Sequence, residues 1–144
     1  MPSITITSAN LQVDGPVLEV HFLISKELEE KLKKEGKSIP EPVVIKAQID
    51  TGASNCVVQE DIPKKLGLQP IGSVKIATPS SRDHLCYTYY MRMLIPAQKI
   101  TYDGIFTAAP LAGQNISSLI GRDLLAHGIL IYIGYAKQFT LSLL

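Results

Sequence analysis

One carboxylate stands at a position in the sequence where it could do chemistry. Asp50 follows an apolar run, Val43 to Ile49, that predicts a β-strand, and Thr51 and Gly52 come directly after it. A carboxylate mounted at the end of a strand can take a proton from a water molecule or return one to a substrate. Gly52 permits a backbone path that a Cβ would forbid, and the Thr51 hydroxyl can both donate and accept a hydrogen bond. These residue types indicate acid–base chemistry, although Asp and Gly are also common in ordinary surface turns.

Two segments together resemble the signatures of one enzyme family. The hexapeptide Ile49-Asp50-Thr51-Gly52-Ala53-Ser54 resembles the active-site loop of aspartic proteases, hydrophobic-Asp-Thr-Gly-Ala/Ser. Ser118 to Leu125 resembles their second signature, which has two apolar residues, a glycine, a polar or charged pair and a short helix. The interval between the segments is similar to that of single-domain, retropepsin-like members. The resemblance covers about residues 43–144, and residues 1–42 are less diagnostic.

The resemblance implies a role for each residue of the loop. Asp50 would be catalytic, and Thr51 would hydrogen-bond across a two-fold axis. Gly52 would approach the substrate backbone, while Gly121 would pack under the loop. The residues expected to bind substrate, the last four of them from a flap-like hairpin, are Ala53, Ser54, Thr78, Pro79, Ser80 and Ser81.

Peptide hydrolysis by carboxylates needs two of them close together, sharing one proton. The sequence contains one Asp-Thr-Gly. The second carboxylate is therefore expected to be Asp50 of another subunit, on the axis of a two-fold symmetric homodimer. Viral members often carry a second acid two residues after the glycine, paired with the arginine of the later motif. That position is Ser54 here, so the usual ion-pair partner of Arg122 is missing.

Composition limits the other possibilities. A chain of 144 residues with 46% hydrophobic and 19% charged residues is expected to form one domain, residues 1–144. A net charge of +1 argues against nucleic acid as a partner, and no apolar run is long enough to span a membrane. Two cysteines and no recognisable signal peptide favour a cytoplasmic protein. No histidine has ligand spacing with a cysteine, so we expect no metal and no cofactor; Cys56 is expected to be a small core residue.

The remaining elements predict an all-β, barrel-like fold of the retropepsin type, with one or two short helices and an inserted helix near residues 25–36. Ser25 is a suitable N-cap of that helix and Gly36 a suitable residue after its end. Strand 100–109 is expected to break at Asp103-Gly104, and Gly128 is expected to end a short helix. The other expected strands are 3–7, 17–24, 87–95, 129–133 and 139–143.

These observations lead to one preferred function and one alternative. We expect an aspartic endopeptidase that acts on peptides or proteins as a homodimer. The alternative is a retropepsin-fold dimerisation or peptide-binding module without significant proteolysis, because a fold does not prove an activity. Residues 140–144, together with the strand around Ile4 and Ile6, are expected to form the dimer seam, because an apolar terminal strand is costly to leave as an open edge.

Overall fold

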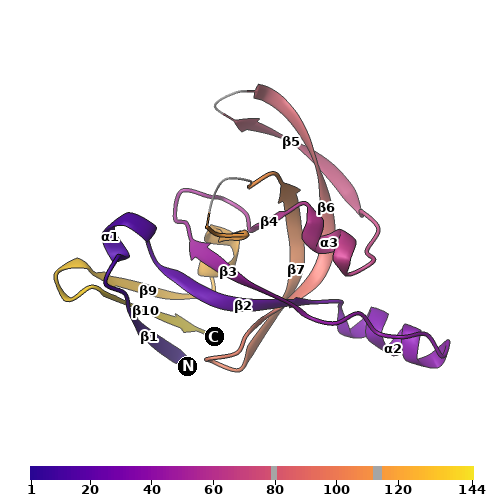
Figure 1. Cartoon of the computed structure of the whole chain (residues 1–144), viewed down its shortest axis with the longest axis horizontal. Helices are drawn as coiled ribbons and strands as arrows, with labels where there is room; N and C mark the ends of the chain where they lie inside the picture. Colours follow the sequence, from indigo (N-terminus) through magenta and orange to yellow (C-terminus); the bar gives the residue numbers. More distant parts are fainter. Residues whose placement is uncertain (79–80, 112–114) are drawn as a thin grey trace.

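A closed barrel of six strands forms the larger part of the fold (Figure 1). The computed structural model describes residues 1–78, 81–111 and 115–144. Around the barrel the strand order is β2-β3-β8-β4-β7-β6, and β2 pairs with β6 to close it. The barrel strands are β2 (Val17–Leu23), β3 (Val43–Ile49), β4 (Val57–Gln59), β6 (Ser81–Ile95), β7 (Ile100–Ala109) and β8 (Ser118–Ile120). The all-β barrel expected from the sequence is confirmed.

Alternating side chains of the strands fill the barrel. On β6, the alternate residues Tyr89, Met91, Met93 and Ile95 are all buried, because side chains two residues apart lie on the same face of a strand. Phe22 on β2 and Phe106 on β7 are fully buried and meet edge to face, with ring centroids 5.2 Å apart. The core therefore fills the barrel, and it continues outside the barrel strands to Phe139, Leu141 and Leu143.

A second, three-stranded antiparallel sheet carries both chain termini. Its order is β1 (Ser3–Thr7), β10 (Gln138–Leu143) and β9 (Gly128–Ile133), with Thr5 opposite Thr140. β10 is thus the central strand, hydrogen-bonded on both sides within the chain. Residues 140–144 are therefore not the open edge that the expected dimer seam was meant to cover, because β1 and β9 pair with β10; among the described strands, the edges of this sheet are β1 and β9.

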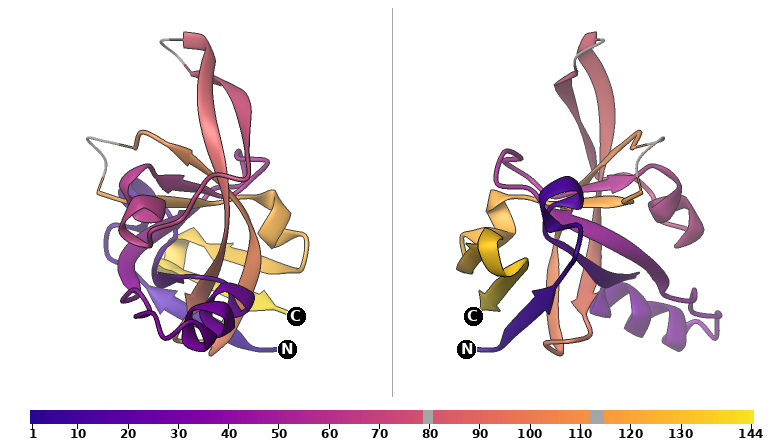
Figure 2. Two further views of the ribbon diagram at one scale, coloured as in Figure 1. Left: turned by 90° about the vertical axis from the view of Figure 1, so that its right-hand side faces the viewer. Right: turned by 60° about the vertical axis from the view of Figure 1, so that its left-hand side comes forward.

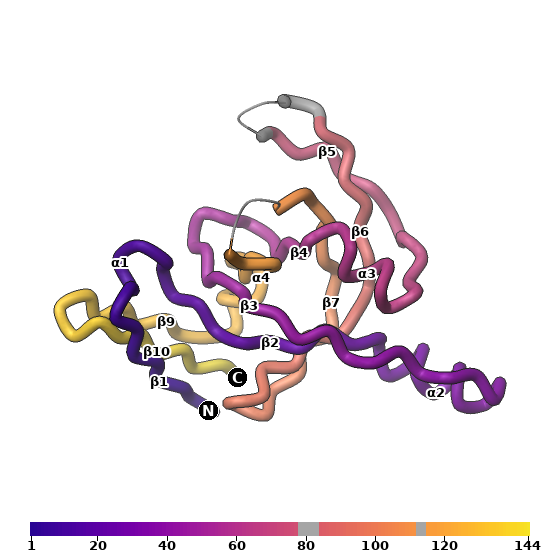
Figure 3. The backbone as a smooth tube through the Cα atoms, viewed as in Figure 1, coloured from indigo at the N-terminus to yellow at the C-terminus, as the bar shows by residue number. Residues whose placement is uncertain are grey.

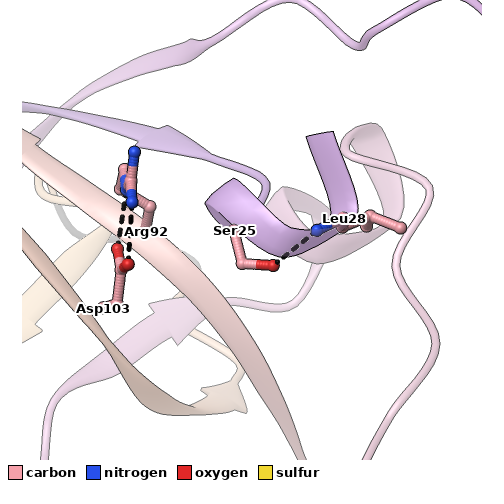
Figure 4. Close-up of polar contacts among 4 residues, drawn as sticks. All are labelled: Ser25, Leu28, Arg92 and Asp103. Atoms are coloured by element: carbon pink, nitrogen blue, oxygen red, sulfur yellow. Dashed lines mark hydrogen bonds and ion pairs between the residues drawn. The ribbon is translucent and has the colours of Figure 1, made fainter. Parts of the chain in front are cut away.

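Helix α2 (Lys26–Lys34) is confirmed near the expected bounds. The Ser25 Oγ accepts a hydrogen bond from the Leu28 N–H at 3.2 Å, as an N-cap does (Figure 4). At the other end Gly36 has φ +67°, and the Lys37 N–H donates to the Leu32 carbonyl oxygen at 2.9 Å. Leu28 and Leu32 pack partly buried against the core. No helix within the described ranges is long and apolar enough to cross a membrane.

Three short α-helices, one more than the maximum expected, accompany α2 in the described part of the chain. They are α1 (Leu11–Asp14), α3 (Asp61–Lys65) and α4 (Arg122–Leu125). The short helix α1 was not expected; it buries Leu11. A turn of 3₁₀ helix, η1 (Gly134–Ala136), joins β9 to β10.

Two glycines have different roles from those expected. β7 continues unbroken through Asp103 and Gly104, because Asp103 is bound by the opposite residue Arg92, and the Tyr102 ring occupies the space that a Cβ on Gly104 would need. Gly128 begins β9 instead of ending α4. A Cβ on Gly128 would collide with the carbonyl oxygen of Ser142 on β10, so close strand approach is the reason for this glycine.

Candidate active site

Asp50 is held at the end of β3 by backbone hydrogen bonds. β3 runs parallel to β8, with Ile49 opposite Ile120, and the Asp50 N–H donates to the Ile120 carbonyl oxygen at 2.9 Å. The Gly52 N–H donates to Asp50 Oδ1 at 2.8 Å, and the Ala53 N–H donates to the Asp50 carbonyl oxygen at 3.1 Å. Asp50 itself is half-buried. The carboxylate thus lies at the end of the strand, and hydrogen bonds define the turn that follows it.

The loop from Asp50 to Asn55, here called the Asp50 loop, crosses from one side of β8 to the other. β8 pairs in parallel with β3 before the loop and antiparallel with β4 after it. Gly121 follows β8 and lies against the loop, where an added Cβ would be 2.5 Å from the carbonyl carbon of Asn55. Gly121 therefore packs against the loop as expected, because only hydrogen fits there.

Helix α4 begins directly against the Asp50 loop (Figure 3). Arg122 Nη1 donates to the Thr51 carbonyl oxygen at 2.7 Å, and the Arg122 N–H donates to the Ala53 carbonyl oxygen at 2.9 Å. The Asp123 N–H donates to the Ser54 carbonyl oxygen at 3.2 Å. Arg122 therefore binds the loop through a main-chain oxygen, which needs no acidic residue at position 54.

A thiol and a carboxylate that the sequence did not connect meet behind the loop. Asp123 Oδ2 accepts a hydrogen bond from the Cys56 N–H at 3.0 Å, and Asp123 Oδ1 lies 3.1 Å from Cys56 Sγ. Burial, together with the neighbouring Asp123, raises the pKa of the Cys56 thiol to about 12, so the thiol is protonated. Cys56 is fully buried, as expected of a core residue, but Asp123 has contacts that its place in the sequence did not indicate.

The residues expected to bind substrate fall into two groups. Ala53 and Ser54 lie in the Asp50 loop, Ala53 half-buried and Ser54 exposed. The other group belongs to the hairpin of β5 (Gly72–Thr78) and β6, in which Thr78 pairs with Ser81. Pro79 and Ser80 lie outside the described residues. The hairpin extends beyond the barrel on the side that carries the loop between β3 and β4 (Figures 1 and 2).

An open groove of about 990 Å³ is lined by residues of β2 and β3 together with residues of β1 and α1. Gln48, two residues before Asp50, lines it and donates from Nε2 to the Asp14 carbonyl oxygen at 2.9 Å. Lys46 and Glu19, which face each other across the two strands, also line the groove. The groove therefore borders the strand that leads to the candidate carboxylate.

The described residues contain no cluster of three or more His, Cys, Asp or Glu that could hold a metal ion. The chemistry available at the loop is that of a carboxylate with one oxygen fixed by the Gly52 N–H. Such a group can act as a general acid or base, and two of them facing each other could activate water.

Comparison with known proteins places this geometry among known folds. Two solved chains match the structure. One is a retropepsin-like aspartic protease from Rickettsia conorii, with a TM-score of 0.55 and 18% sequence identity, covering 96% of this chain and 89% of that chain. The fold is retropepsin-like. At this identity the likeness shows the fold alone. No family model matches the sequence, and no curated protein matches it.

Proposed function

We propose that this retropepsin-like chain is an aspartic endopeptidase, with an active site shared by two copies. Asp50 of each copy would supply one carboxylate. The ionised carboxylate would take a proton from water, and the protonated one would hydrogen-bond the substrate carbonyl oxygen and later give up its proton.

One observation carries the proposal. The only Asp-Thr-Gly of the sequence forms a turn that is fixed to β8, Gly121 and α4, and this turn leaves Asp50 partly accessible. These contacts restrict the backbone of the turn and so fix the position of Asp50. Catalysis requires reacting groups to be accurately positioned in this way. The retropepsin-like fold supports this proposal, because the similar solved structure from Rickettsia conorii is that of an aspartic protease.

The three-stranded sheet is the surface proposed to meet the second copy. One of its faces is uncharged along all three strands and consists of Ser3, Thr5, Thr7, Ser142, Thr140, Gln138, Ile129, Ile131 and Ile133. Ile129 and Ile131 on β9 are 52% and 49% exposed. An uncharged edge strand without proline readily pairs with another strand. We place the seam at this face and at the β1 and β9 edges, because the backbone of β10 is already paired on both sides within the chain.

The experiment that tests the function compares Asp50→Asn with Asp61→Asn. Asp61 is a suitable control because its carboxylate makes an exposed ion pair with Lys65 on α3. We expect the parent and Asp61→Asn to cleave a peptide library detected by mass spectrometry, and Asp50→Asn to lose cleavage at unchanged fold by circular dichroism. Equal cleavage by the parent and Asp50→Asn would refute the assignment.

The alternative is a binding module, and the same variants separate it from the enzyme. Gly52 and Ala53 would contact a bound peptide in either case, so binding alone decides nothing. The binding module would be favoured if the parent binds peptides at micromolar concentration and cleaves none over days, and if Asp50→Asn binds them with the same affinity.

A further inference from the structure

We propose that Asp123 is a positioning residue that fixes the return of the Asp50 loop into β4, acting through hydrogen bonds from the main chain and from the buried thiol of Cys56. The inference rests on the proposed protease function for its kinetic consequences. Its structural part concerns the described contacts alone.

Three donors converge on the Asp123 carboxylate. The Cys56 N–H donates to Oδ2 at 3.0 Å, the Cys56 S–H to Oδ1 at 3.1 Å and the Leu124 N–H to Oδ1 at 2.8 Å. Two of these donors belong to Cys56, the residue directly after the Asp50 loop, and the third lies in the first turn of α4. Because all of them use one carboxylate, loop and helix cannot shift independently.

The thiol extends this contact to Gly121. The Gly121 N–H donates to Cys56 Sγ at 3.4 Å, while the same sulfur donates its proton to Asp123. Burial keeps the thiol protonated, with its pKa raised to about 12. Cys56 thus serves as both donor and acceptor at a point where an aliphatic side chain of the same size could do neither.

An asparagine at position 123 cannot replace the carboxylate. It has the same shape, but one of its two terminal atoms is an NH₂ group, which only donates. If the amide nitrogen takes the place of Oδ2, it faces the Cys56 N–H; if it takes the place of Oδ1, it faces the Leu124 N–H. In either orientation one of the two backbone N–H groups that bind Asp123 loses its acceptor. Asp123→Asn therefore loosens the loop without removing any volume.

A serine at position 56 keeps both functions of the thiol, because a hydroxyl donates to Asp123 and accepts from Gly121. Alanine at the same position keeps only the backbone donor. The pair Cys56→Ser and Cys56→Ala therefore separates hydrogen bonding from the filling of space.

The test measures kcat and KM of Asp123→Asn, Cys56→Ser, Cys56→Ala and Asp103→Asn at protein concentrations where sedimentation shows the same assembly state. Asp103 controls for stability, since its carboxylate binds Arg92 away from the loop. We expect kcat of Asp123→Asn to fall about tenfold or more with KM within about twofold, corresponding to at least about 1.4 kcal/mol at the transition state. Cys56→Ser should retain most of kcat, and Cys56→Ala should lose it several-fold.

Amide hydrogen exchange gives a readout independent of turnover. We expect Asp123→Asn to speed exchange in residues 50–56, and Asp103→Asn to leave that segment at the parent rate. If the parent protein cleaves no peptide, the proposed function is wrong. Faster hydrogen exchange in Asp123→Asn would still support the positioning role of Asp123. Parent-like exchange in Asp123→Asn, or a kcat loss matched by Asp103→Asn at equal loss of stability, would overturn the role of Asp123.

Discussion

Arg92 on β6 donates two parallel hydrogen bonds to Asp103 on β7, from Nε to Oδ1 at 2.7 Å and from Nη2 to Oδ2 at 2.8 Å (Figure 4). The two residues stand directly opposite each other in the antiparallel pair, and both are only partly exposed. Bidentate pairs of this kind are stronger than ordinary surface ion pairs. This contact helps to hold β6 against β7.

The first prediction concerns this pair and pH. The Arg92 hydrogen bond holds the pKa of Asp103 below its ordinary value of 3.8. A lowered carboxyl pKa stabilises the fold above the unfolded-state value, and that contribution is lost as pH falls through the lower, folded-state value. Asp103→Asn should therefore cost about 1–2 kcal/mol of unfolding free energy at pH 7. The difference from the parent should shrink in urea titrations below pH 3.8; a constant difference across pH would contradict it.

A second prediction uses the close approach of Gly121 to the Asp50 loop. Gly121→Ala would place a Cβ 2.5 Å from the Asn55 carbonyl carbon, so the loop must move. We expect a loss of about 1–3 kcal/mol in stability together with loss of peptide cleavage. Gly134→Ala is the matched control, because its Cβ would be 3.5 Å from the Tyr132 ring, an ordinary contact. The midpoint temperatures of thermal unfolding of the two variants test this prediction. Equal midpoint temperatures would argue against the packing role of Gly121.

The third prediction concerns thiol reactivity. A rise in the pKa of Cys56 from 9.0 to about 12 lowers its thiolate population at pH 8 roughly 1,000-fold, and burial blocks access as well. In a Cys86→Ser background, a chromogenic disulfide reagent should leave the native protein unlabelled and react at once in guanidinium chloride. Fast labelling of the native variant would show that Cys56 is open to solvent.

The fourth prediction concerns assembly. Ile131→Lys places a charge on the uncharged face of the three-stranded sheet, where Ile131 is 49% exposed. If two copies meet there, the variant should sediment as a monomer and lose cleavage. Val44→Lys is a control with a similarly exposed residue on the barrel, at 53%. A parent that stays monomeric at high concentration and still cleaves peptides would exclude a shared active site.

The fifth prediction concerns the pH dependence and inhibition of cleavage. Two facing carboxylates must share one proton, so activity should decline as pH rises and both ionise. Pepstatin-like transition-state mimics should inhibit cleavage, and chelators should leave it unchanged. Activity that increases steadily to pH 9 would indicate a thiol or metal mechanism instead.

Local pattern was enough to predict most elements of the fold. Strand 87–95 was expected from its sequence, and the structure buries its alternate residues Tyr89, Met91, Met93 and Ile95, because successive side chains of a strand point to opposite sides. Ser25 and Gly36 mark the ends of α2, because capping depends on residues adjacent in sequence. At Asp103-Gly104 and at Gly128 the expectations from local sequence were wrong, because contacts with other strands decided the outcome.

The sequence by itself determined the position of the candidate carboxylate, because the turn after β3 is built by Asp50 and its immediate neighbours. Only the tertiary structure decided how that turn is held. Asp123 and Cys56 are 67 residues apart, and no periodicity links them. The place of β10 between β1 and β9 was likewise open, since the pairing of strands depends on distant partners that compete for the same backbone hydrogen bonds.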